Sequence, residues 1–162
     1  MAGVDPKAVP RAKWLPDELW EAVKRSLPIA TLDIVFERSG KTLLGYRRIS
    51  PYRNVWAFPG GRFLFGESLT QTARRVASEY GLTPRELYLV GVFPARFKSR
   101  SDVAVAVASP EPDGEPVADG YEFSSLKWFS EPPPNTGANY LKMLTRWRTI
   151  RQNTHLLHSN RV

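Results

Sequence analysis

The sequence predicts an α+β domain in which a mixed sheet lies between layers of helices. Three observations support this prediction. Residues 60–82 read as a glycine pair followed by an amphipathic helix, and segments with strand character lie on both sides of it. A second helical segment lies near the C-terminus, so the helices and the sheet can pack as layers around one core.

The first part of the chain predicts a short helix and then a β-hairpin. Residues 16–24 begin with a proline and two acids, which suit the first turn of a helix, and Pro28 ends the segment. Residues 29–37 and 42–48 are the expected strands. The turn between them, at residues 38–41, contains a serine and a glycine.

The central segment predicts a loop, a brief strand and the main helix. Residues 49–54 form a loop with a proline, and residues 55–58 lead from it into the glycine pair. Ser68 and Gln71 have the spacing of a capping box at a helix start. Apolar residues then recur at helical spacing, and Gly81 supplies a left-handed stop.

The C-terminal half predicts three more strands and a last helix. Residues 86–97, 103–108 and 121–129 have strand character, and residues 138–151 read as a helix. Residues 109–120 hold three prolines, two glycines and four acids, so we expect a loop there.

Length and composition indicate one domain with a basic surface. We expect a flexible arm at residues 1–14, a single domain at residues 15–152 and a basic tail at residues 153–162. The absence of cysteine excludes disulfides, thiolate metal sites and a cysteine nucleophile. The formal charge of +7 fits a phosphate-bearing ligand, a nucleic acid or simply a basic surface. No apolar leader or membrane-spanning run is present, so we expect a cytoplasmic protein.

Residues 60–82, GGRFLFGESLTQTARRVASEYGL, resemble the signature of the Nudix hydrolases. That signature runs Gly, five residues, Glu, seven residues, Arg-Glu, an aliphatic, any residue, Glu-Glu, any residue, Gly, aliphatic. If one residue is missing before the arginine, the matching positions are Gly61, Glu67, Arg74, Val76, Glu79, Gly81 and Leu82. Arg75 and Ser78 stand where the family has glutamates. The resemblance implies a Nudix-like α/β/α sandwich with a mixed central sheet.

Outside the signature, the chain resembles the GDP-mannose mannosyl hydrolases, a Nudix branch that also lacks some signature glutamates. The similarity lies in residues 32–35, 43–48 and 56–62. That branch holds one Mg²⁺ with a carbonyl of the glycine pair, the last signature glutamate and a polar residue on a late strand. The resemblance therefore implies Mg²⁺, with Mn²⁺ as an alternative, held by Gly60, Glu79 and Glu122.

The resemblance also implies catalytic and substrate-binding side chains. The expected catalytic set is Asp33, Arg47, Arg62, Glu67 and Arg74. The expected substrate-binding set is Arg47, Arg48, Arg62 and Tyr52. Guanidinium groups suit these roles because they pair bidentately with phosphate and keep their charge.

The general base is left open by the sequence. The branch places a catalytic histidine where this chain has Phe123, and His155 and His158 lie in the expected tail. The alternatives are Asp33, Glu67, Glu122 and a metal-bound hydroxide.

Several of these residues also have a structural interpretation. Asp33 fits a satisfied polar residue on a strand equally well, and the glutamate at the position of Glu67 often supports the loop in family members. Arg75 precedes Glu79 by four residues, so the two can pair and weaken metal binding.

The sequence thus predicts a Mg²⁺-dependent hydrolase of a nucleoside diphosphate sugar such as GDP-mannose, with water attacking phosphorus or the anomeric carbon. The alternative is a catalytically weak or inactive module that binds a nucleotide sugar, or less readily a nucleic acid, through its basic surface. The resemblance further implies a homodimer.

Overall fold

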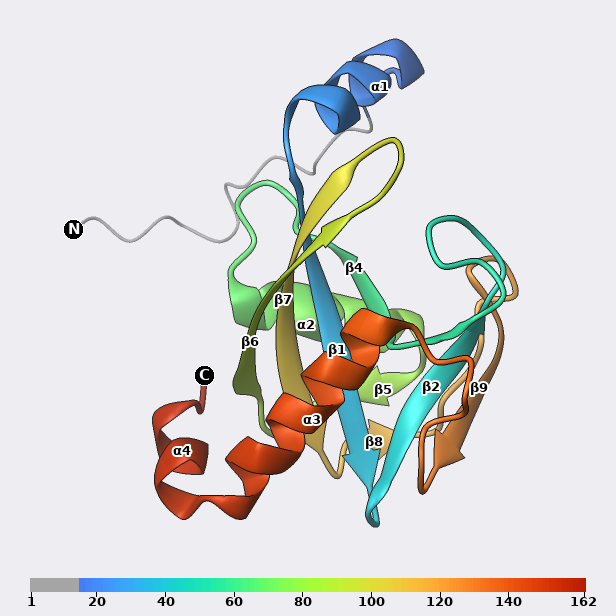
Figure 1. Cartoon of the computed structure of the whole chain (residues 1–162). Coiled ribbons are helices and arrows are strands. Elements are labelled where there is room, and N and C mark those ends of the chain that lie inside the picture. The colour runs from blue at the N-terminus through green and yellow to red at the C-terminus, as the bar shows by residue number, and fades with distance from the viewer. Residues whose placement is uncertain (1–14) are drawn as a thin grey trace, which may run out of the picture.

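The computed structural model describes residues 15–162, so the arm predicted at residues 1–14 lies outside the described residues. A seven-stranded sheet has helix α2 on one face and helix α3 on the other (Figure 1). Strands β1 and β7 are parallel, whereas the other pairs in this sheet are antiparallel, which confirms the predicted mixed sheet between helices. The strands are β1 (Ile29–Arg38), β2 (Lys41–Arg47), β3 (Trp56–Ala57), β4 (Gly60–Arg62), β5 (Leu82–Thr83), β6 (Tyr88–Arg96), β7 (Ser101–Pro110), β8 (Asp113–Gly114) and β9 (Phe123–Phe129). The helices are α1 (Asp17–Ser26), α2 (Leu69–Glu79), α3 (Ala138–Gln152) and α4 (Thr154–Ser159).

Helix α2 begins and ends as its sequence predicts. The Ser68 side chain accepts a hydrogen bond from the Gln71 amide, and the Gln71 side chain accepts one from the Ser68 amide. Gly81, just beyond the helix, has a φ of 73°. A Cβ atom there would lie 2.7 Å from the Glu115 carbonyl oxygen, so both the conformation and the close approach require glycine.

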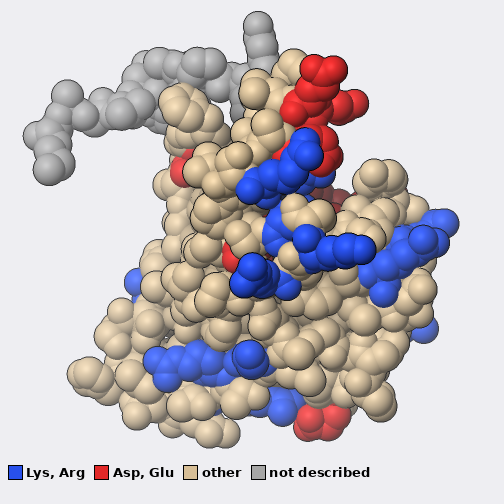
Figure 2. Space-filling view, turned by 45° about the horizontal axis from the view of Figure 1, so that its top comes forward, with Lys and Arg blue, Asp and Glu red and all other residues tan. Residues whose placement is uncertain are grey.

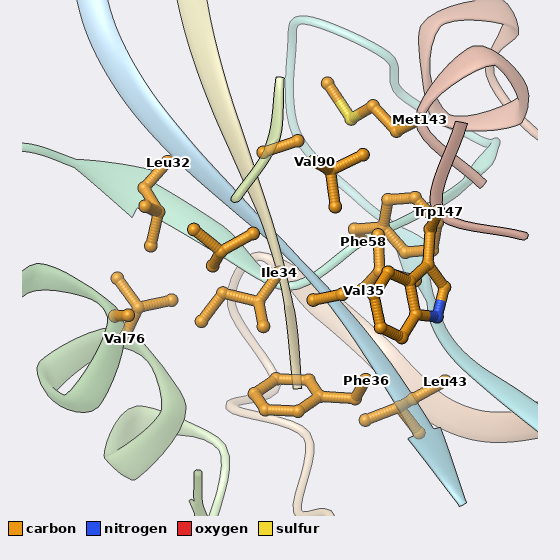
Figure 3. Close-up of a cluster of buried hydrophobic side chains, with 14 of the residues drawn as sticks. Leu32, Ile34, Val35, Phe36, Leu43, Phe58, Val76, Val90, Met143 and Trp147 are labelled. Carbon is orange, nitrogen blue, oxygen red and sulfur yellow. The ribbon is translucent and has the colours of Figure 1, made fainter. Parts of the chain in front are cut away.

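The core fills both interfaces between sheet and helices. On β1, Leu32 and Ile34 point toward Val76 of α2, while Val35 points toward Trp147 of α3 (Figure 3). Successive side chains of a strand alternate between its two faces, so β1 contributes to both packing interfaces. The strand is accordingly a continuous apolar run broken by Asp33, whose side chain lies on the α3 face in the candidate site described below.

Two segments are more ordered than the sequence predicts. Residues 153–162 are not an open tail: they form α4, and the backbone of residues 160–162 hydrogen-bonds Leu87 and Leu89. The predicted loop at residues 109–120 begins later and contains β8, which pairs with β5. The cause is tertiary, because the end of β7 pairs with β1 up to the proline. Proline is compatible with a strand end.

Helix α1 stands apart from the body of the domain (Figure 1). None of its residues is buried, but the Trp20 ring stacks against the Arg62 guanidinium, whose central carbon lies 4.4 Å from the ring centroid. Among residues 15–162, no helix has the length and apolar character needed to cross a membrane.

Candidate active site

A cavity of about 460 Å³ opens on the α3 side of the sheet, next to the glycine pair. Its walls come from β1, β4, β7, α1, α3 and the loop at residues 48–55. Figure 2 shows this end of the molecule, with basic side chains spread over the centre of the face and acidic ones gathered at its top edge. Six residues of the predicted site line the cavity, namely Asp33, Arg47, Tyr52, Gly60, Arg62 and Glu122.

Asp33 is the central carboxyl group of the cavity. It lies on β1 opposite Gly60 of β4, and a Cβ atom at Gly60 would collide with the Asp33 carboxylate and lie 2.7 Å from the Leu32 carbonyl oxygen. The side chain is enclosed by protein yet accessible from the cavity, and burial raises its pKa from 3.8 to about 7. The nearby Arg47 charge opposes this rise, and Asp102 adds to it. A carboxyl group with a pKa near neutrality is suited to general acid–base catalysis.

The raised pKa of Asp33 predicts that the protein is less stable at pH 8 than at pH 5. Between about pH 4 and 7 the folded protein keeps the Asp33 proton that the unfolded chain has lost. The free energy of unfolding therefore falls as pH rises through this window, by up to about 1.4 kcal/mol per pH unit for one proton. Denaturant unfolding of the wild type and Asp33→Asn should show this slope in the difference between the two proteins. Parallel pH profiles would contradict the assignment.

Arg47 lies near Asp33 and bonds other parts of the site. Its Nη1 atom pairs with Glu122, and its Nε–H donates to the Pro51 carbonyl oxygen at 2.6 Å. The guanidinium also lies over the Phe123 ring, with 6.0 Å between its central carbon and the ring centroid. Phe123 itself is fully buried. The position of the branch's histidine is therefore core, and Phe123 has no group for proton transfer.

The charges that line the cavity are nearly balanced. The described lining residues include the guanidinium groups of Arg47, Arg62 and Arg100 and the carboxyl groups of Asp33, Asp102 and Glu122. Burial and the neighbouring Arg100 both lower the pKa of Arg62. The net charge of these six groups is thus +1 when Asp33 is protonated and zero when it is ionised. An anionic ligand in the cavity therefore favours the protonated form of Asp33.

Aromatic rings form one wall of the cavity. Tyr52 packs edge-on against Phe97, with ring centroids 5.2 Å apart, and tilts against Tyr140 of α3 at 5.3 Å. Burial raises the pKa of Tyr52, so its phenol stays neutral. Two aromatic residues that follow the glycine pair do not line the cavity: Phe63 packs against the core, and Phe65 is exposed.

A second polar cluster joins helix α2 to the loop before it. The Arg75 guanidinium bonds Glu67 through Nε at 2.7 Å and Nη2 at 3.0 Å, and Glu79 through Nη1 at 2.9 Å. Its Nη2 also donates to the Arg62 carbonyl oxygen at 2.7 Å. Glu67 further accepts from the Thr72 hydroxyl and the Leu64 amide. The hydrogen bond from Arg75, and after it these two bonds, lower the pKa of Glu67 against the opposing effect of burial. Glu67 is therefore a support of the loop.

These contacts favour a second alignment of the chain to the signature. Arg75 follows Glu67 after seven residues, as the signature requires, so no residue is missing between them. Val76 then occupies the next glutamate position, and its buried side chain packs under Gly61. Tyr80 occupies the last glutamate position, where it is buried against Phe123. In this second alignment the missing residue falls after Glu79, whereas the alignment given above places it before Arg74.

The expected metal ligands are not assembled. Gly60 and Glu122 line the cavity, but Glu122 pairs with Arg47, and Glu79 lies outside the cavity in contact with Arg75. Residues 15–162 contain no cluster of three or more acidic or histidine side chains that could hold an ion. A divalent ion needs several free oxygen ligands, and here a guanidinium occupies the space between the carboxylates. These residues do not fit a resident divalent ion.

We expect Arg75→Met to destabilise the protein by about 1–3 kcal/mol, because Glu67 loses its cation while it stays partly buried. The change also leaves carboxylate and carbonyl oxygens facing one another, so Mn²⁺ should restore part of the lost stability. Thermal unfolding with Mn²⁺ and with EDTA measures both effects. Arg85→Met, which removes an exposed pair with Asp113, is the control and should not respond to the ion. Wild-type stability of Arg75→Met would contradict the bracing role.

The structure separates the remaining predicted residues from the cavity. Arg48 is exposed and donates to the Gly120 carbonyl oxygen at 3.1 Å. Arg74 lies on the exposed side of α2, at a small surface cleft near Arg161. His155 and His158 are exposed on α4. None of these residues lines the cavity.

The structure also adds three residues that sequence reasoning missed. Trp20 of α1 lines the cavity, as do Arg100 and Asp102 at the turn between β6 and β7. Asp102 is buried. In the sequence it follows a short link of charged and hydroxyl residues, and nothing there distinguishes it from a surface residue. A tryptophan in a short helix beside many charged residues was the available signal for Trp20.

The glycine pair, the capped helix and the mixed sheet between helices are the features that the chain shares with Nudix proteins. The NUDIX domain family matches residues 27–139, more than half of the chain, and the chain belongs to this family of hydrolases. Nudix hydrolases generally use divalent metal ions.

Two curated relatives match about two fifths of the chain. The low-salt glycan biosynthesis protein Agl8 of Haloferax volcanii is 40% identical over 65 residues, which are 40% of this chain and 42% of that protein. The ADP-ribose pyrophosphatase of Methanocaldococcus jannaschii is 33% identical over 67 residues, 41% of this chain and 40% of that protein. The chain thus matches less than half the length of either relative.

Solved structures share the fold at lower identity. The MutT NUDIX hydrolase of Burkholderia pseudomallei has a TM-score of 0.67 at 22% identity, covering 74% of this chain and 98% of that one. The NUDIX domain of Shewanella oneidensis NrtR, solved with ADP ribose, has a TM-score of 0.67 at 21% identity, and the match covers 93% of this chain and 94% of that one. These likenesses show the fold.

Proposed function

We propose that the protein hydrolyses a nucleoside diphosphate linked to a sugar, with GDP-mannose as the first candidate. The observation that carries this proposal is the position of Asp33, a carboxyl group with a pKa near 7, in a cavity that Arg47 and Arg62 also line. The glycan-biosynthesis name of one relative and the ADP-ribose name of another support a diphosphate that joins two sugars or a nucleoside and a sugar.

Each side chain of the cavity has a role in the proposed reaction. Arg62 and Arg47 donate hydrogen bonds to the diphosphate oxygens. Asp33 in its ionised form accepts the proton of the attacking water. Glu122 is paired with Arg47, and Glu67 lies outside the cavity, so Asp33 is the base among the carboxylates considered. Trp20, Tyr52 and Phe97 provide faces for a base or a sugar ring.

Product analysis tests the proposal. The protein is incubated with GDP-mannose or ADP-ribose, in Mg²⁺, in Mn²⁺ and in EDTA, and the products are separated by anion exchange. GDP and mannose indicate attack at the anomeric carbon, whereas GMP and mannose phosphate indicate attack at phosphorus. Mg²⁺-dependent turnover would mean that the ion enters with the diphosphate. No products from either compound, with Asp33→Asn as the blank, would overturn the proposal.

A second candidate is a nucleotide-sugar-binding module without turnover. The observation that favours it is the pairing of Glu67 and Glu79 with Arg75, which occupies the carboxylates of the signature helix. Titration calorimetry that shows tight binding of an intact ligand, unchanged by EDTA, would support this candidate.

A further inference from the structure

The turn between β6 and β7 holds a buried ion pair that the proposed chemistry does not use. Arg100 Nη2 donates to Asp102 Oδ2 at 2.7 Å. Asp102 is 7% exposed, and both residues line the cavity. The backbone there is fixed, because the Phe97 amide donates to the Arg100 carbonyl oxygen and Asp102 pairs with Ala95.

Each partner of this pair retains one buried atom without a hydrogen bond. Within the described residues, Asp102 Oδ1 has no donor and Arg100 Nε–H has no acceptor. An unsatisfied buried polar atom is costly, and native structures retain few of them. Both atoms are closed to solvent although the two side chains line the cavity, so a ligand that fills it satisfies them when the side chains rotate toward it.

The pair lies at a different part of the cavity from Asp33. Asp102 is level with Ile29 on β1, and Asp33 is level with Ala106 on β7. Four strand positions, about 13 Å of backbone at roughly 3.3 Å per residue, separate the two residues. An elongated ligand that places its diphosphate by Asp33 and extends along the strands presents another part here.

We propose that Arg100 and Asp102 form a subsite for the neutral, hydrogen-bonding end of the ligand, and that this end is a sugar with free hydroxyl groups or the edge of a base. The assignment rests on the proposed function of the cavity. An ion pair has no net charge, so it selects a neutral group over a further phosphate. Its free acceptor and free donor match a group that donates and accepts side by side. The Phe97 ring, 5.7 Å from the Arg100 guanidinium carbon, supplies an apolar face beside it.

The test measures the affinity for GDP-mannose and for GDP by titration calorimetry, in the Asp33→Asn background so that turnover does not intrude. The variants are Asp102→Asn, Arg100→Gln and the double variant, which keeps the pair neutral. We expect the double variant to lose about 10- to 100-fold in affinity for GDP-mannose. A loss of affinity for GDP-mannose alone assigns the subsite to the sugar. An equal loss of affinity for GDP assigns it to the base.

Ser109→Ala is the matched control. The Ser109 hydroxyl is also buried on β7 without a partner, but it lies outside the cavity. Its removal should leave both affinities unchanged, and thermal unfolding checks that all variants fold. Unchanged affinity in the folded double variant would overturn the subsite while the proposed function stands. Absence of nucleotide binding by the Asp33→Asn background and the wild type alike would overturn both.

Discussion

Asp33→Asn will lower kcat about 10²- to 10³-fold while the affinity for the nucleotide sugar stays the same or improves. The amide keeps the shape of the side chain but cannot accept the proton of the attacking water, and general-base catalysis contributes about 10²- to 10⁴-fold. Binding persists because Arg47 and Arg62 remain and a negative charge has left the cavity. Steady-state kinetics and titration calorimetry measure the two effects separately.

The pH dependence of kcat/KM shows whether Asp33 acts as a base or as an acid. If ionised Asp33 is the base, kcat/KM of the wild type rises with pH through about 7 and is level above it. The variant should lack this inflection. Asp113→Asn, an exposed aspartate paired with Arg85, is the control and should keep the wild-type profile. A rate that falls as pH rises through 7 would contradict the base role and make Asp33 an acid.

Arg47→Met should lower kcat/KM about 10²- to 10³-fold and move the inflection to higher pH. The change removes a phosphate ligand, frees Glu122 to repel the diphosphate and cuts the bond to the Pro51 carbonyl oxygen that holds the loop at Tyr52. It also removes the positive charge that lowers the pKa of Asp33, so this pKa rises further. The pH dependence of kcat/KM is the measurement.

Two variants separate charge from geometry at this position. Arg47→Lys keeps the charge but loses the planar fork, so the inflection should stay near the wild-type value while KM rises. Arg148→Met breaks an exposed arginine–glutamate pair far from the cavity and should change neither quantity. An inflection in Arg47→Met at the wild-type pH would show that Arg47 does not act on Asp33.

Whether the protein needs a resident metal ion depends on residues that differ from the family pattern. Arg75 and Ser78 stand where the family has glutamates, and the buried Phe123 stands where the branch has a histidine. The remaining glutamates of the signature have partners: Glu67 and Glu79 both bond Arg75. Among the described residues, the cations that line the cavity near Asp33 and can meet a diphosphate are therefore the arginines of β2 and β4.

The sequence alone was sufficient for the features that depend on neighbouring residues. The capping box at Ser68, the stop at Gly81 and the boundaries of α3 follow from local hydrogen bonding and helical periodicity. The glycine pair and its signature likewise identified the fold, because their spacing is a property of the chain itself. The resemblance placed Asp33, Arg47 and Arg62 among the expected site residues, and all three line the cavity.

Only the tertiary structure decided which side chains of the site contact one another. Arg75 and Arg74 are neighbours in sequence, yet the turn of the helix directs one to Glu67 and the other to the opposite surface. Asp102 reaches the cavity because β7 pairs in parallel with β1, about 70 residues earlier in the chain. Such pairing, and the burial that raises the pKa of Asp33, depend on packing between distant segments. Local propensity has no information about these contacts.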